Sequence, residues 1–111
     1  MEATAHLRYL RISPRKVSIV GELIRGKDTK TAKAILKHTP KAASAHLYKV
    51  LSSACANAEN NHDMDVDNLI VAQVQVGAGP VLKRIAPRAR GSAFRIRKRT
   101  SHITVTVREL E

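Results

Sequence analysis

Eight lysines and arginines and no acidic residue occupy residues 83–99, a run of cations that a compact core cannot absorb. A segment with so many like charges repels itself and needs counter-charge from another molecule. The core must therefore form from the residues on either side of this run. Its cations are Lys83, Arg84, Arg88, Arg90, Arg95, Arg97, Lys98 and Arg99.

The basic run has the pattern of a two-stranded ribbon. Leu82, Ile85, Phe94 and Ile96 keep a weak alternation, and the sequence PRARG at residues 87–91 is typical of a turn. Residues 81–101 are therefore predicted to form a long β-hairpin that leaves the main sheet. An isolated ribbon is marginal in water, so we expect order only against a partner. The alternative is a basic arm without a fixed structure, which the strand patterns on both flanks disfavour.

Three segments outside the ribbon alternate between apolar and polar residues as strands do. They are residues 5–12, 69–76 and 103–107. In the first strand, alternation puts Leu7 and Tyr9 on one face, opposite Arg8, Leu10 and Ile12. In the other two strands, the predicted inward-facing residues are Ile70, Ala72, Val74, Val76, Ile103, Val105 and Val107, with Thr104 and Thr106 facing outward.

Three helices are predicted between the first two strands. The first begins at Ser13-Pro14, with Ser13 as N-cap and Pro14 at the first helical position. The second begins near Asp28 or Thr29, and Thr39-Pro40 is expected to start the third in the same way as Ser13-Pro14. A polar loop, residues 60–68, follows the third helix. The apolar residues at helical spacing are Val17, Val20, Leu23, Ile24, Ala32, Ile35, Leu36, Ala43, Leu47, Val50, Leu51, Ala54 and Ala58.

This order of elements favours helices stacked on one face of an antiparallel sheet. We predict an α+β fold, with three helices packed on a small antiparallel three-stranded sheet and a long protruding β-hairpin. The chain is expected to be a single domain, residues 1–111. Its globular part covers about residues 1–80 and 102–111, and its extended basic hairpin covers about residues 81–101.

The net charge indicates a polyanionic partner. The formal charge is +11 at pH 7, whereas a magnitude of roughly 2–8 is usual for a soluble small domain. Six of the eight cations in residues 83–99 are arginines, and the planar arginine fork suits bidentate phosphate contact with a structured ligand such as folded RNA. Since Tyr9, Tyr48 and Phe94 are the only aromatic residues, single-strand binding through stacked bases is not expected.

Other classes of protein find little support. No apolar run approaches the ~18 residues of a membrane span, and the first residues lack the pattern of a signal peptide. Cys55, the single cysteine, excludes an intrachain disulfide and is expected to be a buried apolar residue in a reducing compartment. The acidic residues at 63–67 lack the glycine and glutamate of a calcium loop. We expect no cofactor, no metal site and no catalytic site, and His102 is predicted to contact RNA.

Five stretches, in order along the chain, resemble the signature of a known family. The segments that carry the resemblance are RISPRK at 11–16, TPKAA at 39–43, ANAENN at 56–61, KRIAPRARG at 83–91 and IRKRTSHITV at 96–105. They span essentially the whole chain and resemble the bacterial-type large-subunit ribosomal protein twenty-two family. Ser92 departs from that pattern, which usually has a basic residue there.

The resemblance implies a cytoplasmic protein of the large ribosomal subunit. Its globular domain would lie near the polypeptide exit, and its hairpin would contact several domains of the large ribosomal RNA and act early in assembly. The hairpin tip would line the exit tunnel beside the extended loop of ribosomal protein four and meet the nascent polypeptide. Carried over by position, the tip is Arg88, Ala89, Arg90 and Gly91, the stem contacts are Lys83, Arg84, Arg95, Arg97, Lys98 and Arg99, and a second RNA surface at the hairpin base is Arg11, Arg15 and Lys16.

Two other interpretations remain open from the residues alone. An architectural DNA-binding protein can place basic β-ribbon arms in the minor groove. Such a protein is usually a dimer, whereas the best apolar stripe here is needed for the single core, so no homo-oligomer is expected. An RNA-cleaving enzyme that uses His102 is the third interpretation.

Overall fold

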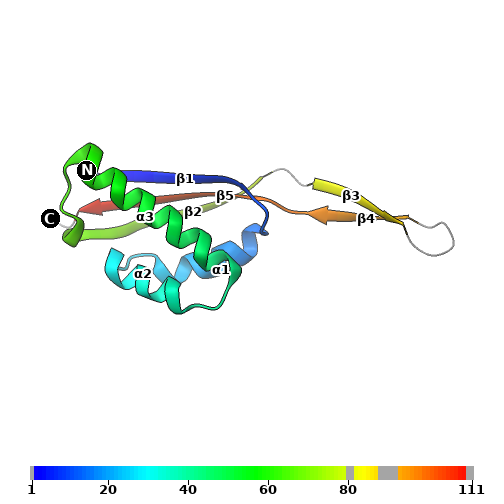
Figure 1. Ribbon diagram of the computed structural model, residues 1–111, viewed down its shortest axis with the longest axis horizontal. Coiled ribbons are helices and arrows are strands. Elements are labelled where there is room, and N and C mark those ends of the chain that lie inside the picture. The colour runs from blue at the N-terminus through cyan, green and yellow to red at the C-terminus, as the bar shows by residue number, and fades with distance from the viewer. Residues whose placement is uncertain (1, 80–81, 88–92, 110–111) are drawn as a thin grey trace.

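The structure is a computed structural model that describes residues 2–79, 82–87 and 93–109, with the backbone alone for residues 82–87 and 93–98. Three strands form an antiparallel sheet in the order β1-β5-β2, and β3 pairs with β4 in a separate two-stranded sheet. The three helices cover one face of the larger sheet (Figure 1). The predicted α+β class is confirmed. The elements are β1 (Glu2–Leu10), α1 (Pro14–Ile24), α2 (Thr29–His38), α3 (Ala42–His62), the short 3-10 helix η1 (Val66–Asn68), β2 (Leu69–Ala78), β3 (Leu82–Pro87), β4 (Ala93–Lys98) and β5 (Ser101–Glu109).

The β3–β4 pair extends away from the three-stranded sheet along the long axis of the molecule (Figure 1). The chain measures 64 × 26 × 16 Å along its principal axes. The antiparallel register runs from Leu82 opposite Lys98 to Pro87 opposite Ala93. Of the turn predicted at residues 87–91, Pro87 ends β3, and residues 88–91 and Ser92 lie outside the described residues.

The core lies between the helices and the sheet. The predicted apolar stripe of α3 is buried along its whole length, from Ala43 to Ala58, and Ile103, Val105 and Val107 of β5 are buried as predicted. Cys55 is also buried, as expected, and desolvation raises the pKa of its thiol. Local periodicity therefore predicted which residues of α3 and β5 are buried in the core.

The helix starts follow their capping residues, with one exception. Ser13 Oγ accepts a hydrogen bond from the Lys16 N–H at 3.5 Å, and an Asp28 carboxylate oxygen accepts one from the Thr31 N–H at 3.2 Å. The prediction that Thr39-Pro40 starts α3 is wrong. The Thr39 hydroxyl instead donates to the Ile35 carbonyl at 2.6 Å and so ends α2, while α3 begins after Lys41 without a side-chain cap.

The predicted inward face of β2 is wrong at its amino-terminal end, because the strand contains a register shift. Ile70 and Ala72 were expected to face the core, yet Leu69, Val71 and Val74 are the buried residues. The pairing of β2 with β5 shifts between Val71 and Gln73, and one extra residue exchanges the two faces of a strand. The alternation therefore fails on the amino-terminal side of the shift.

Several smaller expectations also change. In β1 a register shift between Leu7 and Leu10 separates Leu7, which packs against the core, from Tyr9, which is exposed. Leu23 is exposed on α1, and Thr106 is buried in the central strand, between Thr4 of β1 and Gln73 of β2. The loop predicted at residues 60–68 is shorter, because α3 continues to His62 and η1 follows.

Candidate nucleic-acid interface

Most of the acidic residues lie at the end of the described sheet that is opposite the β3–β4 pair. At one end Glu2 lies opposite Arg108 and Glu109 lies opposite Leu69. The acidic residues at 63–67 follow α3 at the same end (Figure 1). At the other end Leu10 and Ala78 lie opposite Ser101, where the chain leads into β3 and β4. The basic run therefore starts far from most of the acidic side chains.

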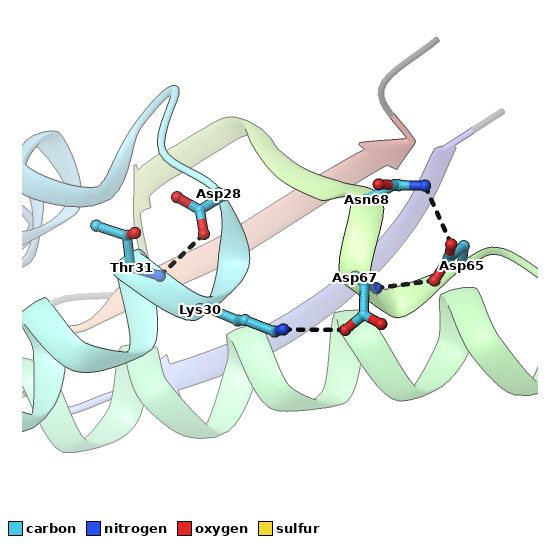
Figure 2. A network of polar contacts seen from close by, with 6 residues as sticks. All are labelled: Asp28, Lys30, Thr31, Asp65, Asp67 and Asn68. Atoms are coloured by element: carbon cyan, nitrogen blue, oxygen red, sulfur yellow. Dashed lines mark hydrogen bonds and ion pairs between the residues drawn. The ribbon is translucent and has the colours of Figure 1, made fainter.

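Figure 2 shows three aspartates in this region, Asp28, Asp65 and Asp67, each in contact with a neighbouring residue of the fold. Asp65 accepts hydrogen bonds from the Asp67 N–H and the Asn68 side-chain amide, each at 3.0 Å. Asp67 forms an ion pair with Lys30 at 3.1 Å, and both side chains are largely exposed. At Asp28, hydrogen bonds from the Thr31 hydroxyl and N–H lower the pKa of the carboxyl. These carboxylates stabilise helix starts and a loop rather than neutralising the basic end.

Hydrogen bonds join the base of the β3–β4 pair to the globular part. The Gly79 N–H donates to the Thr100 carbonyl at 3.0 Å. The Ser101 hydroxyl donates to the Ile12 carbonyl, which holds the segment after β1 against β5. Arg11 and Arg99, both exposed, flank this junction in the chain. The Ser101–Ile12 hydrogen bond thus places the segment that carries Arg11 beside the base of the β3–β4 pair.

The stem residues occupy register positions that concentrate charge. Lys83 is the Cα partner of Arg97, and Ile85 is the partner of Arg95. Like charges in directly opposed positions weaken an isolated ladder, so an anion between or beside the strands would stabilise the pair. Arg84 lies in β3 and Lys98 ends β4. The predicted tip residues Arg88, Ala89, Arg90 and Gly91 lie outside the described residues.

A second group of cations surrounds the start of α1. Arg15 and Lys16 are exposed in its first turn. Lys16 lines a groove of about 360 Å³ together with Ile12 and Lys41. Neither α1 nor α3 has an acidic residue in its first turn, so no carboxylate offsets the positive end of either helix dipole. Lys41 was not predicted, because no local pattern shows that α1 and α3 begin at the same groove.

His102 lies in β5 beside the junction and is half-buried. Its Nδ1 accepts a hydrogen bond from the Tyr9 N–H at 3.1 Å. Tyr9 is exposed and was not among the predicted site residues, since three scattered aromatic residues gave no stacking pattern.

None of the described helices is long and apolar enough to cross a membrane.

The fold and the charge distribution define a small, strongly basic α+β protein whose cations gather around a pair of strands extending from the sheet. The chain belongs to the family described as ribosomal protein L22p/L17e, whose model matches residues 5–108. The family is one of ribosomal proteins rather than enzymes, which sets aside the RNA-cleaving and architectural DNA-binding interpretations.

Curated relatives match nearly the whole chain and carry the name large ribosomal subunit protein uL22. The relative from Acetivibrio thermocellus is 63% identical over 108 residues, which cover 97% of this chain and 86% of the relative. The relative from Caldicellulosiruptor saccharolyticus is 58% identical over 110 residues, covering 99% and 90%. The relative from Desulfitobacterium hafniense is 61% identical over 108 residues, covering 97% and 95%.

Proposed function

We propose that this chain is a structural constituent of the large subunit of the cytoplasmic ribosome and binds the large ribosomal RNA. The observation that carries the proposal is the concentration of cations in the paired strands β3 and β4, where Lys83 lies directly opposite Arg97, with most carboxylates at the far end of the sheet. Folded RNA supplies phosphates on both sides of such a ribbon. The stem residues and His102 would form the first contact surface, and Arg11, Arg15 and Lys16, extended by Lys41, would form the second.

The resemblance extends the proposal to assembly and to the exit tunnel. The stem contacts would join several RNA domains early in subunit assembly. The tip residues Arg88, Ala89, Arg90 and Gly91 would line the tunnel near ribosomal protein four and meet the nascent polypeptide. Stem and tip therefore have separate roles: the stem anchors the ribbon, and the tip faces the tunnel.

The salt dependence of RNA binding tests the stem. If about six ribbon cations meet phosphates, the logarithm of the affinity falls against the logarithm of salt with a slope of about −4 to −5. The double variant Arg97→Gln, Arg99→Gln should flatten this slope by about two. The control variant Lys30→Gln, Arg108→Gln removes the same charge from the opposite end and should leave the slope unchanged. A parent slope near −1, or equal flattening in the control, would show that the ribbon is not the binding element.

Reconstituted ribosomes test the division between stem and tip. Stem substitutions such as Arg95→Gln with Arg97→Gln should lower the yield of large subunits in sedimentation. Arg90→Ala should leave the yield near that of the parent and alter peptide-dependent stalling measured by toeprinting. If Arg90→Ala blocked subunit formation as severely as the stem variant, the tip would be an anchor and the division would be wrong.

A further inference from the structure

Tyr9 has a backbone conformation that an aromatic residue rarely adopts. Its φ angle is 60°, in the left-handed region, where a bulky side chain is unfavourable. The residue lies within the register shift of β1 between Leu7 and Leu10, and a β-bulge of this kind re-aims a side chain. Leu7 and Leu10 pack against the core, whereas the Tyr9 side chain is 65% exposed. The strain therefore serves to hold an aromatic ring outward rather than to complete the core.

His102 holds this ring from the central strand. The Tyr9 N–H donates to His102 Nδ1 at 3.1 Å. The two rings meet edge to face, with centroids 4.9 Å apart and planes at 90°. An edge-to-face contact occupies only part of a ring, so Tyr9 keeps a free surface while its backbone is anchored.

Gly79 leaves the space in which the His102 ring sits. A Cβ atom at residue 79 would lie 3.1 Å from Cε1 and 3.2 Å from Nε2 of His102, and 2.5 Å from Thr100 Oγ1. Any side chain here would clash with Thr100 Oγ1 and crowd the His102 ring. Residues from β1, β5 and the end of β2 thus cooperate to place one exposed tyrosine.

The surroundings of the ring identify its ligand. Arg8 and Arg11 flank Tyr9 in the chain and are exposed, and Arg99 is exposed near the junction with β5. A preorganised aromatic face with exposed arginines nearby in the chain matches a nucleotide, whose base stacks while its phosphate meets a cation. We propose that Tyr9 is a stacking platform for an unpaired base of folded RNA, with His102 and Gly79 as positioning residues. The proposal rests on the proposed RNA binding and adds to it a contact that composition alone argued against.

Binding of purified large-subunit ribosomal RNA to the full chain tests the platform. Tyr9→Leu should weaken binding about 10-fold, the loss expected for one stacked base, while Tyr9→Phe should stay within about twofold of the parent. Neither change should alter the salt slope, because stacking releases no counterions. The matched control is Tyr48→Leu, at the other tyrosine, which should bind as the parent does.

A fluorescence signal reports the contact directly. The chain contains no tryptophan, so Tyr9→Trp introduces a single reporter. RNA should quench this tryptophan by stacking, whereas the tryptophan of Tyr48→Trp should be unaffected. Absence of quenching in a Tyr9→Trp protein that still binds RNA would overturn the proposal.

The variant Tyr9→Gly separates a structural role for Tyr9 from a role in stacking. Glycine adopts a positive φ without strain, so the Tyr9→Gly protein should melt no lower than the parent. Its affinity for RNA should fall by as much as that of Tyr9→Leu. If Tyr9→Gly unfolds at a lower temperature while keeping its affinity, Tyr9 is structural. If the parent itself fails to bind RNA, the proposed function fails. If the RNA affinity of the parent falls steeply with salt concentration and Tyr9→Leu binds RNA equally well, only the stacking platform fails.

Discussion

Gly21 in α1 lies directly against Val74 in β2, and a Cβ atom at residue 21 would come within 3.0 Å of Val74 Cγ1. Both residues are buried, which leaves Val74 little room to move. The substitution Gly21→Ala gains about 1 kcal/mol of helix propensity, but overpacking costs about 1–3 kcal/mol. We expect a net loss in the free energy of unfolding, measured by urea denaturation.

The double variant Gly21→Ala, Val74→Ala tests whether this contact causes the loss. Shortening Val74 frees the space that the new methyl group needs. The two changes should therefore couple favourably by about 1 kcal/mol in a double-mutant cycle. If the two substitutions changed the free energy of unfolding additively, the contact between residues 21 and 74 would not be the cause of the loss.

Ser44→Ala should raise stability. The Ser44 side chain is buried, and its Oγ has no hydrogen-bond partner among the described residues. Removing a desolvated and unpaired hydroxyl should increase the free energy of unfolding by up to about 1 kcal/mol. The control is Ser101→Ala, since the Ser101 hydroxyl donates to the Ile12 carbonyl and its removal should cost about 1–2 kcal/mol. Equal losses in both variants would contradict the assignment of Ser44 as unpaired.

The Asp28 cap should make stability depend on acid pH. Its folded-state pKa lies below the ordinary value of 3.8, because the Thr31 hydroxyl and N–H bond to the charged carboxylate. A lowered pKa stabilises the fold above pH 3.8, and the contribution is lost as pH falls through the folded-state pKa. The melting-temperature difference between the parent and Asp28→Ala should be constant near neutral pH and shrink on acidification. A difference that persists unchanged in strong acid would contradict this cause.

The globular part should fold without the basic strands. We propose that replacing residues 82–99 with an Asn-Gly turn leaves a cooperative thermal transition, because the core is built from residues 3–74 and 103–107. The Gly79 and Thr100 hydrogen bond at the base remains available to close the shortened connection. Circular dichroism in the far ultraviolet measures the outcome. Loss of that signal would show that core and hairpin are not separable, while retained structure with lost RNA affinity supports the division.

Features encoded by neighbours in the chain were predictable. The α3 stripe, the start of α2 near Asp28 and the inward-facing residues of β5 depend on residues within a few positions of each other, so local sequence patterns predicted them. The basic run was equally visible, because charge density is a property of the sequence itself. The prediction at Thr39 failed because its hydroxyl satisfies the helix before it rather than the helix after it.

The sequence alone determined the order of the α-helices and strands, the core stripe of α3 and the location of the excess charge. Tertiary structure decided which face each edge strand presents, because the register shifts near Tyr9 and Val71 depend on pairing with β5. It also decided which distant residues meet: Lys16 with Lys41 at one groove, and Tyr9 with His102 across two strands. The physical reason is that periodicity reports a residue's own element, whereas a bulge or a contact between elements depends on hydrogen bonds made with another part of the chain.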